Sequence, residues 1–171
     1  QAGSMEAGAF NLCGATPVQA THNGNAVLDG DDLLGFILFS DPADTLGSIL
    51  FTSSSSVFDF ALPLQYDQTY YIAAIAGNNL NGNVDLSDPC LNISNAVTVL
   101  WRPLPTVALS VVNPDICPGA CTNVAATFTG TAPFTLTYTA NGGSPVTQTF
   151  SSNTGSFQVC VPANAPAGGF G

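Results

Sequence analysis

Two short acidic clusters have the residue types and spacing that could bind a ligand. Their members are Asp29, Asp31 and Asp32 in the first cluster, and Asp85 and Asp88 in the second. Closely spaced carboxylates beside Asn carbonyls are hard oxygen ligands of the kind that Ca²⁺ prefers. Neither cluster has the twelve-residue EF-hand spacing, and Asp and Asn also cap turns and tolerate left-handed backbone geometry. The clusters therefore indicate either a structural Ca²⁺ site or ordinary turns, and no other cofactor is expected.

Five cysteines are the second set of reactive side chains. The sequence has no CxxC pair and one histidine, His22, so a zinc site is not indicated. Disulfide bonds formed in an oxidising compartment are the better interpretation. Cys13 and Cys90 are the only cysteines of the first half of the chain, which predicts a bridge between them.

The second half carries the other three cysteines. Cys121 opens one expected strand and Cys160 ends another, which favours a bridge between these two. Cys117 is then unpaired or paired with a cysteine outside this segment, and a bridge between Cys117 and Cys121 is the alternative. A catalytic thiol is not expected, because no basic neighbour is available to stabilise a thiolate.

No constellation for catalysis is found. His22 precedes Asn23-Gly24, a turn signal, and no Gly-x-Ser-x-Gly elbow is present to supply a nucleophile. A pair of carboxylates for glycoside hydrolysis would have to join Asp29 with Asp85 or Glu6, and no spacing singles these out. The sequence therefore predicts that the protein is not an enzyme.

An aromatic platform for sugars is the remaining candidate site, formed by Trp101, Tyr66, Tyr70 and Tyr71. Tyr70 and Tyr71 are neighbours in an expected strand and must point to opposite faces of the sheet. Tyr70 also stands where a tyrosine corner would place it, which is a packing role. A core role is favoured for these rings, and a carbohydrate-binding module of a secreted enzyme is kept as the alternative function.

The composition limits the partners and the location of the chain. It is 46% hydrophobic and 7% charged, with one Arg, no Lys and 11 acidic residues. Nucleic-acid binding is excluded because basic side chains supply most of its affinity, and attraction to anionic lipids is excluded for the same reason. The apolar residues alternate with Thr, Ser and Asn and form no run of about 18, so no membrane insertion is expected.

Strand signals separated by short turns predict an all-β fold made of two β-sandwich modules. The expected strands are residues 18–21, 34–40, 46–52, 57–62, 70–76 and 96–101 in the first half, and 106–112, 122–129, 134–139, 146–150 and 156–161 in the second. Ten of the 11 acidic residues precede Trp101, and two prolines follow it closely. These shifts place the boundary between modules 1–103 and 104–171.

The second module has about five expected strands, fewer than the seven typical of an immunoglobulin-like sandwich. Its closing strands are expected to come from a neighbouring segment by strand addition, for example from residues 1–10 of another copy, or from chain outside these residues. The chain opens on Gln1 and shows no signal peptide, so it is interpreted as part of a longer secreted precursor.

Several runs resemble a known family of repeats. These runs are HNGNAVLDGDDLLGFIL (22–38), TYYIAAIAG (69–77), GNVDLSDPC (82–90), ICPGA (116–120) and FTGTAPFTLTY (128–138). They are similar to repeat modules of giant cell-surface adhesins of Bacteroidota, of the gliding-motility type, which carry immunoglobulin-like repeats. The resemblance covers nearly the whole chain.

The resemblance implies export by type IX secretion, display on the cell surface, and a structural or adhesive role in a repeat array or filament. The partners it implies are neighbouring repeats or subunits of the same protein, with surface glycans as a further partner. It also implies that Cys117 pairs near the end of its module. Asp44-Thr45-Leu46 is similar to the short O-glycosylation motif of Bacteroidota, which makes Thr45 a candidate for modification.

Overall fold

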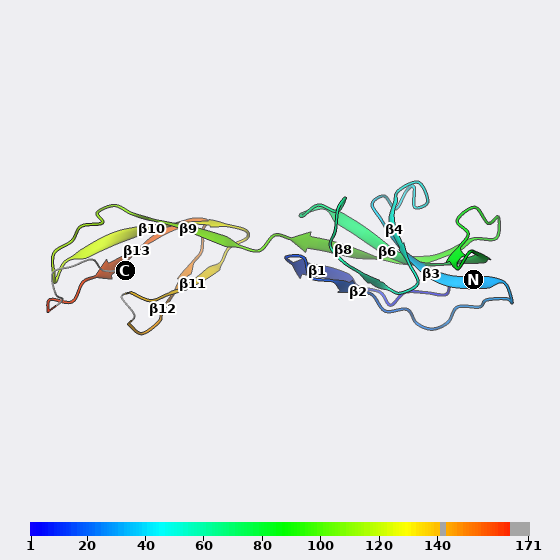
Figure 1. Cartoon of the computed structure of the whole chain (residues 1–171), viewed down its shortest axis with the longest axis horizontal. Coiled ribbons are helices and arrows are strands. Elements are labelled where there is room, and N and C mark those ends of the chain that lie inside the picture. Colours follow the sequence, from blue (N-terminus) through cyan, green and yellow to red (C-terminus); the bar gives the residue numbers. More distant parts are fainter. Residues whose placement is uncertain (141–142, 165–171) are drawn as a thin grey trace. The chain divides into compact units, whose positions relative to one another are not determined.

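Strands and turns build the chain, and no helix occurs in the residues that the structure describes. The structure is a computed structural model that describes residues 1–140 and 143–164. The chain divides into two compact units, Gln1–Pro103 (unit 1) and Leu104–Gly171 (unit 2), which have the bounds expected for the two modules (Figure 1). The all-β fold class predicted from the sequence is confirmed.

Unit 1 contains one large sheet and one small sheet. The large sheet has the order β1-β8-β6-β3-β4, with β7 paired to β6, and the small sheet is the pair β2-β5. The bounds are β1 (Ala9–Cys13), β2 (Val18–Gln19), β3 (Asp32–Phe39), β4 (Ile49–Ser53), β5 (Val57–Phe58), β6 (Thr69–Leu80), β7 (Asn83–Val84) and β8 (Asn92–Arg102). All neighbours pair antiparallel except β1, which lies parallel to β8.

The core of unit 1 follows from the period-2 alternation of its long strands. Alternate residues of β6 and β8 point to one face, and Tyr70, Ile72, Val97, Val99 and Trp101 are all at most 2% exposed there. The side chains of the small sheet, Val18 and Phe58, pack against that same face. A second buried cluster, Ile37, Phe39, Ala73 and Ile75, covers the opposite face of the large sheet. Apolar runs without alternation in β3 and β6 are thus explained by burial on both faces.

The first residues of the chain also belong to unit 1. Ala2 and Met5 are buried, and the backbone of Met5 exchanges two hydrogen bonds with the side chain of Asn95, at 2.9 and 3.0 Å. The backbone N–H of Ala2 donates to Oδ1 of Asn92 at 2.8 Å. Residues 1–10 therefore complete their own unit, which does not fit the expectation that they complete another copy.

Unit 2 contains a three-stranded sheet and a hairpin. The sheet has the order β13-β10-β9, and the hairpin is the antiparallel pair β11-β12. The bounds are β9 (Thr106–Val111), β10 (Cys121–Thr129), β11 (Phe134–Tyr138), β12 (Val146–Phe150) and β13 (Thr154–Cys160). Four phenylalanines, Phe128, Phe134, Phe150 and Phe157, form most of a small core with Val124 and Ala126. The hairpin signal at Asn141-Gly142 lies outside the described residues, although its two strands pair as expected.

Candidate functional site

The two acidic clusters lie at the same end of the large sheet of unit 1. Asp32 pairs in register with Asn78, and the backbone N–H of Asn78 donates to Oδ2 of Asp88 at 2.8 Å. The backbone N–H of Asn79 donates to the carbonyl oxygen of Asp31 at 2.8 Å. The fold thus brings two turns together that are about fifty residues apart in the sequence.

The carboxylates of these turns accept hydrogen bonds from nearby backbone groups. Asp88 is 7% exposed, and its second oxygen accepts the N–H of Cys90 at 2.8 Å. Asp29 accepts the N–H of Asp31 at 3.2 Å. Within residues 1–140 and 143–164, no group of three Asp, Glu, His or Cys side chains stands close enough to hold a metal ion. Turn capping accounts for the carboxylates of Asp29 and Asp88, and Ca²⁺ binding stays a prediction.

One carboxylate in the second turn has a shifted pKa. The Ser87 hydroxyl donates to Oδ1 of Asp85 at 2.6 Å, and the Ser87 backbone N–H donates to the same oxygen at 2.8 Å. Both bonds favour the ionised carboxylate, so they lower the pKa of Asp85 below its ordinary value, the hydroxyl contributing most. Asp85 is half-buried, and both donors come from Ser87 two residues further on, so this is a local turn effect.

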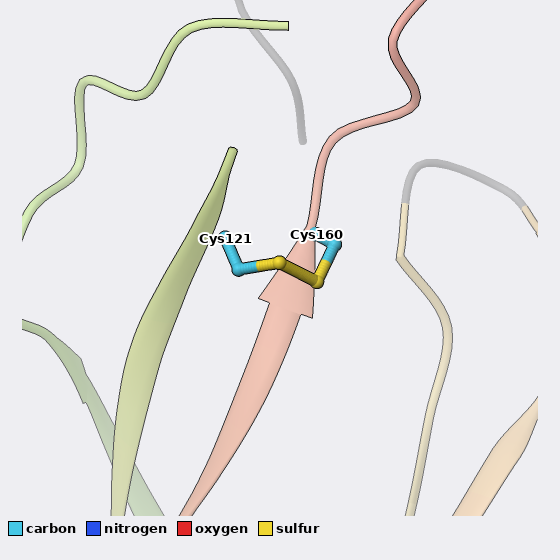
Figure 2. The surroundings of a disulfide bond; sticks show 2 residues. All are labelled: Cys121 and Cys160. Carbon is cyan, nitrogen blue, oxygen red and sulfur yellow. A yellow bond between two sulfur atoms is a disulfide. The ribbon is translucent and has the colours of Figure 1, made fainter. Parts of the chain in front are cut away.

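The disulfide expected in unit 2 is present. Cys121 and Cys160 face each other directly across β10 and β13, with Cα atoms 3.9 Å apart (Figure 2). Val124 and Phe157 point from these strands into the core, so the alternation turns both cysteines to the outer face. Cys117 is exposed and free, and the alternative bridge between Cys117 and Cys121 is absent.

The predicted bridge between Cys13 and Cys90 is wrong. Both cysteines are exposed and free. Cys13 pairs in register with Arg102 at the end of β8, whereas Cys90 precedes the first residue of β8, Asn92. A strand of this length separates them by about 30 Å at ~3.3 Å per residue, far beyond the ~7 Å Cα separation that a disulfide can span. Membership of the same half of the chain did not imply proximity.

The aromatic residues do not form an exposed platform. Trp101 and Tyr70 are buried, the Trp101 ring N–H donates to the carbonyl of Thr16 at 2.8 Å, and the two rings lie 6.1 Å apart. Tyr71 stacks on Phe39 on the opposite face of the sheet. Tyr66 is 39% exposed and stacks on Phe60, whose ring lies 5.5 Å from that of Trp101. The core role predicted from the sequence is confirmed for Trp101 and Tyr70.

His22 forms an antiparallel β-bridge with Met5, and Thr45 lies in a turn. Nδ1 of His22 accepts the backbone N–H of Gly24 at 3.1 Å, which leaves Nε2 to donate to the carbonyl of Ala2 at 2.7 Å. His22 thus links the first residues of the chain to the following turn. Thr45 is half-buried in the loop before β4, where the carboxylate of Asp44 caps the backbone N–H of Gly47 at 3.1 Å.

Unit 2 has an apolar groove on one side of its three-stranded sheet. It has a volume of about 570 Å³ and is bordered by Leu109 and Val111 of β9, Tyr138 of β11, and Phe157 and Val159 of β13. Among the residues of unit 2 that the structure describes, no charged side chain lines it. The groove was not predicted from the sequence, although the apolar residues Val107, Leu109 and Val111 alternate along β9.

No protein-family model and no curated protein matches this chain. No helix among the described residues is long and apolar enough to cross a membrane.

Proposed function

We propose that this chain is a structural or adhesive repeat of an extracellular bacterial surface protein, built from two immunoglobulin-like modules in tandem. The observation that carries the proposal is a connectivity present in both units. In unit 1, the hairpin β3-β4 lies in sequence between β2 and β5, which pair with each other. In unit 2, the hairpin β11-β12 lies in the same way between the paired strands β10 and β13.

The strand order of unit 1 supports an immunoglobulin-like identity. The order β8-β6-β3-β4, opposed by β2-β5, corresponds to the G-F-C-C′ and B-E strands of a variable-type sandwich. Tyr70 lies near the start of β6, and its hydroxyl accepts the backbone N–H of Gln65 five residues upstream. This contact has the form of the tyrosine corner, which occurs at the same place in that architecture.

An extracellular location is supported by the disulfide between Cys121 and Cys160, because such bonds persist in oxidising compartments. A surface rich in Ser, Thr and Asn, with a formal net charge of −10, fits a protein exposed to the medium. From the resemblance to Bacteroidota adhesin repeats we further propose display on the cell surface after type IX secretion, with neighbouring repeats or subunits as partners. Surface glycans are the proposed target of adhesion.

Surface display is tested on intact cells of the source organism. Antibodies raised against residues 1–171 are expected to label unpermeabilised cells, and external protease is expected to remove the label. A control antibody against a cytoplasmic protein should give no signal before permeabilisation. Labelling that requires permeabilisation would overturn the proposal.

The repeat character has its own test in the flanking sequence. A block similar to residues 1–171 should recur in the full-length protein with a period of about 170 residues, as tandem arrays do. Deletion of several blocks is expected to weaken attachment of cells to a glycan-coated surface without changing growth. A full-length protein in which this block stands alone beside a catalytic domain would instead favour the carbohydrate-binding alternative.

A further inference from the structure

The repeated connectivity shows what unit 2 lacks in its described residues. In unit 1, β6 pairs with the edge of β3 that β4 leaves free, and β8 follows β6. In unit 2, β12 pairs with one edge of β11, and within residues 104–140 and 143–164 no strand pairs with the other edge. One row of backbone N–H and C=O groups on β11 is therefore available for pairing.

The core face of the three-stranded sheet is open beside that edge. The register places Val111 opposite Val124 and Leu109 opposite Ala126, so all four side chains lie on one face. Val124 and Ala126 are 7% and 1% exposed, whereas Val111 and Leu109 are 47% and 50% exposed. The apolar face of β9 thus points to the same side as the core and remains uncovered.

Unit 1 indicates what covers such a face. There, side chains of β6 and β8 such as Ile72 and Val99 pack against Val18 and Phe58 of the small sheet, and all four are at most 5% exposed. The corresponding side of β10 and β13 in unit 2 borders the groove of about 570 Å³. In unit 1 this face is covered by strands such as β6. That strand is extended, has no charged side chain on its inner face, and is apolar at alternate positions.

We propose that the unit 2 groove binds an extended polypeptide strand with apolar side chains at alternate positions, which adds to the free edge of β11. Backbone hydrogen bonds to β11 supply affinity, and the inward side chains cover Leu109, Val111 and Tyr138. The uncharged lining excludes a strand with charged inward residues, because an unpaired charge there would lose its hydration. This site goes beyond the surface role proposed above and does not depend on it.

Other occupants fit the groove less well. A small apolar ligand would cover the side chains but leave the edge of β11 unpaired. A second copy of this chain offers unit 1, whose β6 and β8 are already paired, and whose N-terminal residues are held by Asn92 and Asn95. A strand that is not paired within a domain of its own can both pair with the free edge of β11 and cover the apolar face of β9.

The first experiment measures binding of a strand peptide to the whole chain. The probe is a fluorescent peptide with the sequence of residues 69–80 and a short polar tail, followed by fluorescence anisotropy. A matched peptide with Ile72→Asp is expected to bind at least about tenfold more weakly, because it would bury an unpaired charge. A third peptide, N-methylated at alternate amides, keeps the side chains and is expected to lose binding because it cannot pair with β11.

The second experiment varies the protein. Val111→Asp in the groove should reduce affinity for the peptide by about tenfold or more. Val146→Asp on β12 is the matched control, since Val146 is 44% exposed and does not border the groove, and it should leave affinity unchanged. Thermal unfolding of both variants establishes that unit 2 stays folded.

Four results would each overturn the proposal. The peptide of residues 69–80 could fail to bind the folded chain, or Val111→Asp could bind it as tightly as Val146→Asp does. Equal binding of the N-methylated peptide would show apolar contact without strand addition. A dimer of the free chain that Val111→Asp dissociates, measured by sedimentation, would make a second copy the occupant.

Discussion

The hydroxyl of Tyr70 accepts the backbone N–H of Gln65 at 2.7 Å, in an otherwise apolar core. The bond ties the loop before β6 to the strand that lies at the centre of the large sheet. Tyr70→Phe is expected to lower the free energy of unfolding of unit 1 by about 1 kcal/mol, because the Gln65 N–H loses its partner.

Urea unfolding measures this loss through the fluorescence of Trp101, the only tryptophan of the chain, which reports on unit 1. Tyr66→Phe serves as the control, since Tyr66 is 39% exposed, and it should change stability by less than ~0.5 kcal/mol. Equal effects of the two substitutions would contradict the role assigned to the Tyr70 hydroxyl.

Asp88 supplies a second prediction for unit 1. Asp88→Ala removes the acceptor for the N–H groups of Asn78 and Cys90 in a buried position, so a loss of about 1–3 kcal/mol is expected. Asp31→Ala is the control, because the Asp31 contact to Asn79 uses its backbone carbonyl. If Ca²⁺ raised the melting temperature of the parent protein and Asp31→Ala abolished that rise, the carboxylates would act as ligands rather than caps.

The turn at Asp85 makes a prediction about pH. Ser87→Ala removes the hydroxyl bond that contributes most to lowering the pKa of Asp85, so the pKa should move up toward its ordinary value. Because the pKa is lowered in the folded state, the bond stabilises the turn above the unfolded-state pKa and is lost as pH falls through the folded-state pKa. Carboxyl ¹³C shifts followed against pH check this, and an unchanged titration of Asp85 in the variant would refute it.

Reduction of the disulfide should act on unit 2 alone. The bond joins residues 39 apart in the sequence, and the chain-entropy model assigns such a loop about 4 kcal/mol of stabilisation. Calorimetry with and without a phosphine reductant should show one transition moving to lower temperature, while the Trp101 fluorescence transition stays in place. The double variant Cys121→Ser/Cys160→Ser should behave as the reduced protein, and a shift of the Trp101 transition would contradict independence of the units.

Thiol counting checks the corrected cysteine assignment. Alkylation of the unreduced, denatured chain should modify Cys13, Cys90 and Cys117, and reduction should expose the remaining two. Peptide mapping identifies the modified residues. A disulfide-linked peptide pair containing Cys13 and Cys90 would restore the bridge that the structure lacks.

The alternation of apolar and polar residues was sufficient to predict most strands, because period 2 is a local property of the chain. The boundary after Pro103 was inferred instead from the acidic residues that precede Trp101 and the prolines that follow it. Alternation was not sufficient for β1, whose five residues pair in parallel with β8, some ninety positions later. The expected strand 70–76 also ended too early, because β6 runs on through Asn78 and Asn79 to Leu80 before Asn81 and Gly82 adopt left-handed angles. Turn-forming residue types such as Asn thus concealed the end of this strand.

The candidate sites were less predictable because they depend on distant contacts. The pairing of Cys121 with Cys160 followed from their positions at strand ends. The distance between Cys13 and Cys90 depended on the direction of β8, which no local pattern reveals. The carboxylate of Asp88 is held by an N–H from another strand, a contact that composition cannot indicate.

The direct opposition of Cys121 and Cys160 has a consequence for how β13 finds its alignment. β13 carries Thr, Gly, Ser and Gln among its seven residues, so its apolar side chains constrain the pairing only weakly. A shift by one residue would turn Cys160 to the inner face, and a shift by two would move the two cysteines to diagonal positions about 7–8 Å apart. Oxidation can therefore occur in only one alignment, and the covalent bond preserves that alignment once the strands have found it.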